Sequence, residues 1–158
     1  MRLALRRRAR HARVLARALP GLFRSPEHRR LFVELLALSQ SLPRRLDRPL
    51  PEAMSSLAPQ ATAGASLPEG TTRDLADLAA LVDRRSPLGL CLRRSLTRYF
   101  ALRRIGVPVV VRFGARRGGP EGATAVAGHA WLTLDGAPYH EPDDEWRGFV
   151  VMYSHPKA

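Results

Sequence analysis

The stretch that decides the fold of this chain is residues 86–113, which read Ser86-Pro-Leu-Gly-Leu-Cys-Leu-Arg-Arg-Ser-Leu-Thr-Arg-Tyr-Phe-Ala-Leu-Arg-Arg-Ile-Gly-Val-Pro-Val-Val-Val-Arg-Phe113. Up to Gly106 the apolar residues recur at helical spacing, and a serine followed by a proline is a typical helix start. After Gly106 the residues become β-branched and apolar. We therefore expect a helix over residues 87–104, closed by Gly106, and a strand over residues 107–113.

Strand patterns continue toward the C-terminus. Asp135-Gly136 is a strong hairpin signal, and the Gly- and Arg-rich residues 115–124 predict a loop. Because predicted helices precede strands joined by hairpins, the expected fold class is α+β rather than parallel α/β. Besides the first strand, the strands are expected at residues 125–134, 137–141 and 148–153.

Two helices with leucine stripes and basic polar faces are predicted near the N-terminus. The first covers residues 2–18 and ends at Pro20. The second begins at Ser25, a good N-cap residue with Pro26 in the first helical position, and stops before Pro43. We expect these helices to form an antiparallel pair that packs on the rest of the chain.

Residues 43–70 contain five prolines among Ser, Ala and Gly, which predicts a long loop. A short helix is then expected from Thr71, which forms a capping-box pattern with Asp74, to about Asp83. The predicted organisation is a basic helical extension (1–42), a loop (43–70) and a core (71–158).

Positive charge is concentrated in the N-terminal third. Residues 1–50 contain 13 arginines against three acidic residues, a net charge of +10, whereas residues 51–158 carry 13 basic and 11 acidic groups, a net charge of +2. Such a surface attracts nucleic acid, a membrane or an acidic polypeptide, or is simply a solvated helix face. The chain has no nucleic-acid-binding motif, so charge alone argues weakly for that partner.

The chain of 158 residues has the length of one domain. It has no apolar run long enough for a membrane span and no apolar segment typical of a secretory signal. Cys91 is the only cysteine, which excludes an intrachain disulfide and suits a reducing cytoplasm. We therefore expect a cytoplasmic protein.

Cys91 and His129 are the candidates for chemistry. Cys91 falls near the start of the predicted helix, where the helix dipole and nearby Arg93 and Arg94 favour the nucleophilic thiolate. His129 falls on a predicted strand, and a helix-start thiol with a strand histidine is the arrangement of cysteine hydrolases and acyltransferases. The alternatives are a small buried cysteine and a structural histidine. A carboxylate should orient the imidazole, and the candidates are Asp135, Glu141, Asp143 and Asp144.

Three stretches of this sequence together resemble a known family. They are Leu90-Cys-Leu-Arg-Arg-Ser-Leu96, followed by Arg103-Arg-Ile-Gly-Val-Pro-Val109, and His129-Ala-Trp-Leu-Thr-Leu-Asp-Gly136. Over about residues 75–155 the chain resembles the lasso-peptide B proteins, the transglutaminase-like leader peptidases of lasso-peptide biosynthesis. The resemblance implies a papain-like fold with a cysteine, a histidine and an acidic third member. It implies removal of the leader from a ribosomally made precursor peptide.

The resemblance also assigns roles and partners. Cys91 matches the family nucleophile and His129 the family base. The acidic partner aligns with Glu141, where the family usually has aspartate, so Asp143 ranks second and Asp135, in the hairpin turn, third. Because the N-terminal residues are predicted helical, a fused β-rich recognition domain is not expected. The implied partners are a discrete leader-recognition protein and an ATP-using cyclase.

Other residues near these blocks have weaker signals. Trp131 lies two residues after His129 and should share its strand face, covering the site or filling the core. The backbone N–H of Cys91 can contribute to an oxyanion hole. The histidines elsewhere are too scattered for a metal site, and no cofactor is expected. Three arginines flank the cleft in sequence and either bind acidic groups of a precursor or are solvated: Arg112, Arg116 and Arg117.

Two rival functions remain open. The same cysteine and histidine can catalyse a different acyl transfer, because hydrolysis and aminolysis share one acyl-enzyme. Outside enzymes, the chain could be a basic binding module with an inert thiol.

Overall fold

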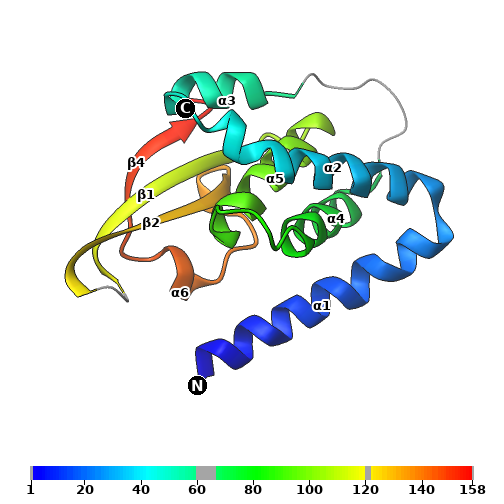
Figure 1. The fold of residues 1–158 in the computed structure, drawn as a ribbon, viewed down its shortest axis with the longest axis horizontal. Coiled ribbons are helices and arrows are strands. Elements are labelled where there is room, and N and C mark those ends of the chain that lie inside the picture. Colours follow the sequence, from blue (N-terminus) through cyan, green and yellow to red (C-terminus); the bar gives the residue numbers. More distant parts are fainter. Residues whose placement is uncertain (1, 60–66, 120–121, 158) are drawn as a thin grey trace.

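The computed structural model describes residues 2–59, 67–119 and 122–157, and the side chains of residues 2–8, 10, 119, 122–124, 143 and 144 lie outside that description. Helices gather on one side of an antiparallel sheet, and α5 lies next to the strands (Figure 1). The expected α+β class is confirmed. In chain order the elements are α1 (Arg2–Arg24), α2 (Pro26–Arg45), α3 (Leu50–Leu57), α4 (Glu69–Val82), α5 (Leu90–Arg104), β1 (Val110–Gly119), β2 (Gly122–Leu134), β3 (Ala137–Pro138), α6 (Asp143–Trp146) and β4 (Val150–His155).

The sheet has the strand order β3-β2-β1-β4. In the β1–β2 ladder, Gly114 lies opposite His129 and Arg116 opposite Ala127. β1 and β2 therefore occupy most of the region predicted as a loop over 115–124, with β1 running to Gly119 and β2 starting at Gly122. That prediction was wrong because ladder hydrogen bonds join backbone groups, so pairing with β2 overrides the weak strand preference of Gly and Arg.

The hairpin turn at Asp135-Gly136 is confirmed. Both residues have positive φ, 50° and 80°, as a two-residue type I′ turn requires. The returning strand β3 is much shorter than the predicted 137–141, because Pro138 has no N–H for a ladder and His140 turns the backbone with a φ of 50°.

Prolines ended fewer helices than predicted. Ser25 caps α2 as expected, and its hydroxyl accepts from the His28 N–H at 3.4 Å. However, α1 continues past Pro20 to Arg24, and α2 continues past Pro43 to Arg45. Each proline removes only its own N–H from the helical ladder, and the residues after it can still donate to carbonyl groups one turn earlier.

The region 43–70 also differs from the predicted loop. Helix α3 lies within it, with a proline in its first turn, where the missing N–H costs nothing. α4 begins at Glu69, two residues before the expected Thr71. Residues 60–66 lie outside the described ranges.

One apolar core joins the helices to the sheet. Its largest fully buried members come from α2, α3, α4, α5 and the strands, and they include Leu35, Leu42, Met54, Leu75, Leu96, Tyr99, Val111 and Leu132. The predicted core region 71–158 thus packs directly on the two preceding helices. α1 packs on α2 and α4 through Val14, Ala18 and Leu22.

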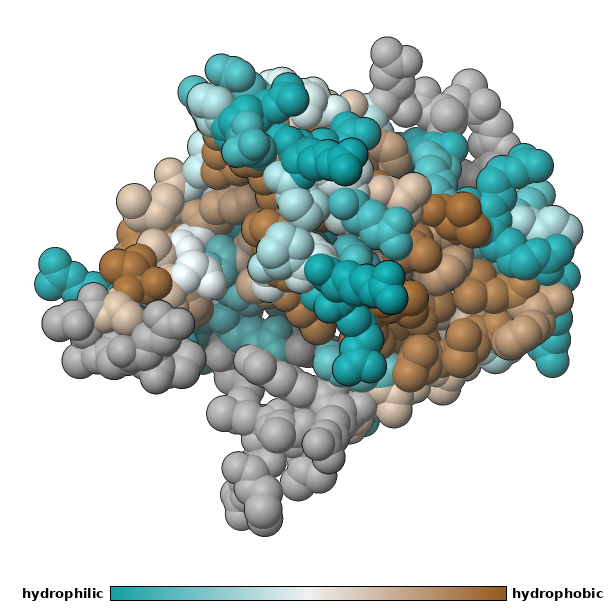
Figure 2. Space-filling model, viewed as in Figure 1, coloured by the Kyte–Doolittle hydropathy of each residue, from teal (hydrophilic) through white to brown (hydrophobic). Residues whose placement is uncertain are grey.

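The outer face of α1 combines arginines with an apolar stripe. Leu15, Leu19 and Phe23 recur every four residues, and Phe23 is 83% exposed. Figure 2 shows apolar surface on the side of the molecule where the C-terminal half of α1 runs. Within the described ranges, every helix is too short or too polar to cross a bilayer.

Candidate active site

Cys91 is the second residue of α5. The helix starts at Leu90 with Gly89 as N-cap, three residues later than the predicted start at Pro87. Residues in the first turn of a helix have no intrahelical partner for their N–H groups. The half-buried Cys91 thiol therefore lies beside backbone donors at the positive end of the helix.

The loop before α5 is held by Arg93. Its guanidinium donates to the backbone oxygens of Ala80 at 2.7 Å, Leu88 at 3.1 Å and Asp83. The Asp83 carboxylate lies 3.9 Å from the same guanidinium and accepts from the Ser39 hydroxyl at 2.8 Å. Arg93 thus fixes the backbone that leads to Cys91, and Asp83 balances its charge.

His129 is enclosed by aromatic rings. Its imidazole stacks on Trp131 at a centroid distance of 5.8 Å and an interplanar angle of 16°, which confirms the predicted common face. The Phe149 ring lies 5.2 Å from the imidazole on another side. Trp131 is 3% exposed and fits over Gly114, where a Cβ atom would lie 2.8 Å from the indole. The ring of His129 therefore has a defined orientation.

Two carboxylates approach His129. A ring nitrogen of His129, an oxygen of Glu141 and an oxygen of Glu145 all lie within 4.8 Å of one another. The Glu141 side chain is fully buried, whereas that of Glu145 is 18% exposed. Glu141, the carboxylate ranked first from the sequence, thus lies near the imidazole.

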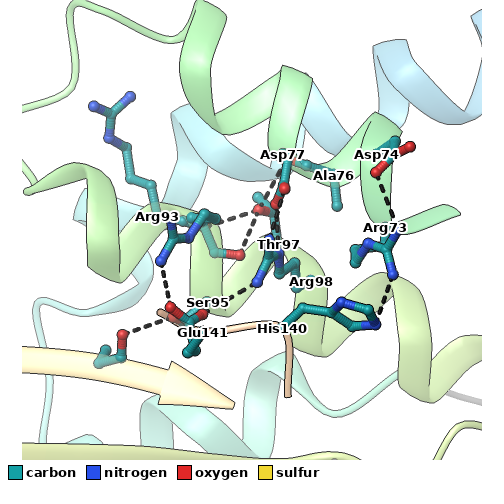
Figure 3. Close-up of polar contacts among 12 residues, drawn as sticks. Arg73, Asp74, Ala76, Asp77, Arg93, Ser95, Thr97, Arg98, His140 and Glu141 are labelled. Carbon is teal, nitrogen blue, oxygen red and sulfur yellow. Dashed lines mark hydrogen bonds and ion pairs between the residues drawn. The ribbon is translucent and has the colours of Figure 1, made fainter. Parts of the chain in front are cut away.

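Two arginines of α5 hold Glu141 in place. Arg94 donates to one carboxylate oxygen at 2.6 Å and Arg98 to the other at 3.1 Å. Arg98 also forms two hydrogen bonds with Asp77 of α4, at 2.5 and 2.7 Å (Figure 3). Burial raises the pKa of Glu141, and the two guanidinium groups oppose that rise. Burial acts to lower the pKa of Arg98, but Asp77 and Glu141 outweigh it, and the net direction is upward.

The face of α5 that carries Cys91 is the face turned to these groups. Cys91, Arg94 and Arg98 lie at i, i+3 and i+7, on one side of the helix. Ser95, at i+4, donates to the backbone oxygen of Ala130 at 2.8 Å. The thiol therefore lies one helical turn from Arg94 and Ser95. Arg94 contacts the carboxylate of Glu141 beside His129, and Ser95 contacts Ala130, the neighbour of His129 in β2.

Residues 30–154 match the profile of the Transglutaminase-like superfamily. The chain belongs to this superfamily. The match begins within α2 and ends one residue before the end of β4, so the fold is a transglutaminase-like domain. No curated protein and no solved structure matches the chain.

The other carboxylates predicted from the sequence have different positions in this transglutaminase-like domain. Asp135 is exposed in the hairpin turn, six residues along β2 from His129. The side chains of Asp143 and Asp144 lie outside the described residues, although their backbone forms α6. Arg94, predicted to favour the Cys91 thiolate, directs its guanidinium to Glu141 and Glu145 instead.

Sequence reasoning missed the network around Glu141. Arg94 with Arg98 and Glu141 with Glu145 are each spaced by four residues, which is the one local sign of paired charges. No local sequence pattern connects the arginine pair with the glutamate pair, and none indicates that Asp77 belongs to the same network. His129, Glu141 and Glu145 also have the donor atoms of a metal site, but two guanidinium groups already neutralise Glu141 and compete with a cation there.

Proposed function

We propose that this transglutaminase-like domain is a cysteine peptidase that removes the leader from a ribosomally made lasso-peptide precursor. The position of Glu141 carries this proposal, because it brings a fixed carboxylate within 4.8 Å of the histidine that matches the family base. Superfamily membership supports a cysteine hydrolase or acyltransferase. The resemblance of the sequence blocks at Cys91 and His129 supports the choice of substrate.

The proposed reaction is acyl transfer through Cys91. The thiol gives its proton to His129 and the sulfur attacks the carbonyl carbon of the scissile amide. The Cys91 N–H donates to the oxygen that becomes negative in the tetrahedral intermediate. His129 then protonates the leaving amine, the C–N bond breaks, and water releases the leader from the thioester with His129 again as base.

Glu141 is proposed to stabilise the imidazolium that forms in the first step. Arg94 and Arg98 favour the ionised form of its carboxylate against the burial that raises its pKa, and the second contact of Arg98 with Asp77 keeps the carboxylate in place. A carboxylate in this role also fixes which imidazole nitrogen faces the thiol. We expect a ring nitrogen of His129 within ~4 Å of the Cys91 sulfur.

The precursor, a discrete leader-recognition protein and an ATP-using cyclase are the proposed partners. The experiment combines purified protein, precursor and recognition protein and resolves the products by mass spectrometry, with and without a primary amine. The proposal predicts free leader and free core peptide even when the amine is present. Leader joined to the amine would support the rival acyl transfer. No cleavage, with Cys91 inert to iodoacetamide at neutral pH, would support the non-enzymatic binding module.

A further inference from the structure

Arg116 is a cation that contacts the aromatic rings around His129. It lies two residues from Gly114 on β1, and Gly114 is opposite His129. Since side chains on a strand alternate between faces, Arg116 projects from the same sheet face as His129. Its guanidinium carbon lies 4.5 Å from the centre of the Phe149 ring.

Phe149 connects this cation to the candidate base. Its ring centre is 5.2 Å from that of His129, so the guanidinium of Arg116 is no more than about 10 Å from the imidazole centre. About 10 Å corresponds to three residues of an extended peptide. The cation–π contact restricts the arginine to this position without neutralising its charge.

The charge of Arg116 is available to a ligand, in contrast to the arginines around Glu141. Arg94 and Arg98 are buried and paired with carboxylates. Arg116 is exposed and, among the described side chains, forms no ion pair. A guanidinium that is placed beside a reaction centre recognises carboxylates well, because its donors match their two oxygens.

We propose that Arg116 is a specificity residue that binds an acidic side chain, Asp or Glu, within about three residues of the cleaved bond of the substrate. This inference rests on the proposed pairing of Cys91 with His129. The inference adds a substrate class, namely peptides with an acidic residue near the scissile bond. The pairing of Cys91 with His129 does not by itself specify this class.

Arg117 offers a matched control. It is also exposed, and as the next residue on β1 it projects from the opposite face. Arg116→Gln and Arg117→Gln therefore remove the same charge from adjacent positions, so a general effect of the net charge appears in both variants. An effect of a binding site appears only in the first.

The first measurement is cleavage of a synthetic peptide library, read by mass spectrometry. Wild-type protein should cleave peptides with Asp or Glu near the bond on the order of tenfold faster than their Asn or Gln counterparts, as expected for one hydrogen-bonded charge pair. Arg116→Gln should cleave both sets equally, Arg116→Glu should prefer Lys or Arg, and Arg117→Gln should behave as wild type. An acidic preference that survives Arg116→Gln would overturn the proposal.

The second measurement does not require peptidase activity. The rate of Cys91 alkylation by iodoacetate is divided by the rate with iodoacetamide, which differs chiefly in charge. At low ionic strength Arg116→Gln should lower this ratio about threefold, and Arg117→Gln should leave it unchanged. Equal ratios in wild type and both variants, or equal decreases in both variants, would contradict the inference even if leader cleavage stands. If the alkylation ratios are as predicted but the leader is not cleaved, that result would instead contradict the proposed function.

Discussion

Arg94 donates to Glu141 across 2.6 Å, and this ion pair joins α5, the helix that carries Cys91 in its first turn, to the segment that returns past His129. Arg98 continues the network to Asp77 of α4. Three parts of the chain, far apart in sequence, thus fix one buried carboxylate. The consequences for stability and for the proposed chemistry can be measured separately.

Glu141→Gln should destabilise the protein by about 3 kcal/mol, because it leaves two buried guanidinium groups without their shared anion. It should also lower the rate of leader cleavage while Cys91 can still be alkylated. Glu145→Gln is the control, since Glu145 is partly exposed and its contact with Arg94 is longer, at 3.4 Å. This control variant should lower the free energy of unfolding, measured in urea, by less than about 1 kcal/mol. Similar losses in the two variants would show that Glu141 has no special role.

Arg98→Lys keeps the charge but should lower the free energy of unfolding by about 2 to 3 kcal/mol. An ammonium group cannot reproduce the two hydrogen bonds to Asp77 together with the third to Glu141. Cleavage should slow as Glu141 loses an anchor. Arg104→Lys is the control, because it makes the same substitution in the half-exposed ion pair of Arg104 with Glu34. It should lower the free energy of unfolding by no more than about 0.5 kcal/mol. Chemical denaturation of both variants measures the difference.

Gly114→Ala should disturb His129 through Trp131. The new Cβ would lie 2.8 Å from the indole and 3.0 Å from the backbone oxygen of Val150, neither of which moves easily. We expect a loss of about 1 to 3 kcal/mol and slower cleavage. At Gly128, next to His129, a Cβ meets nothing within 4 Å, so Gly128→Ala should change stability by no more than about 0.5 kcal/mol. If Gly114→Ala is equally benign, the packing of Trp131 does not position His129.

Tyr139 should give the protein an alkaline limit. Burial and its hydrogen bond to Glu69 raise the pKa of Tyr139 from 10.0 to about 12. Because the folded state keeps this proton longer than the unfolded state, the stabilisation is complete below about pH 10 and is lost as the pH rises toward 12. The loss should be on the order of 2 to 3 kcal/mol.

Tyr139→Phe removes that titration, so its free energy of unfolding should fall less steeply than that of wild type between about pH 9 and pH 11.5 in urea titrations. Parallel pH dependence in the two proteins would show that another group sets the alkaline limit.

Local sequence signals predicted those features that depend on a few neighbouring residues. Asp135-Gly136 forms the predicted turn because both residues tolerate positive φ, and Ser25 caps α2 through its own hydroxyl. The alternation of strand side chains placed Trp131 beside His129. In each case the cause lies within a few residues of the effect.

Features that depend on distant partners could not be predicted in this way. Arg116 and Arg117 have little strand preference, yet pairing with β2 makes them part of β1. The prolines of region 43–70 suggested a loop, although a proline in the first turn of α3 is compatible with a helix. The contact of Arg94 with Glu141 spans 47 positions, and no local pattern specifies it.

The most direct test of the proposed peptidase compares cleavage of the precursor by wild-type protein and by Cys91→Ala. Cys91 is half-buried, so losing its sulfur should leave circular dichroism and urea unfolding nearly unchanged. The proposed mechanism predicts no leader release by Cys91→Ala and almost none by Cys91→Ser, because a hydroxyl is far less acidic than a thiol. Leader release at the wild-type rate by folded, purified Cys91→Ala would contradict it.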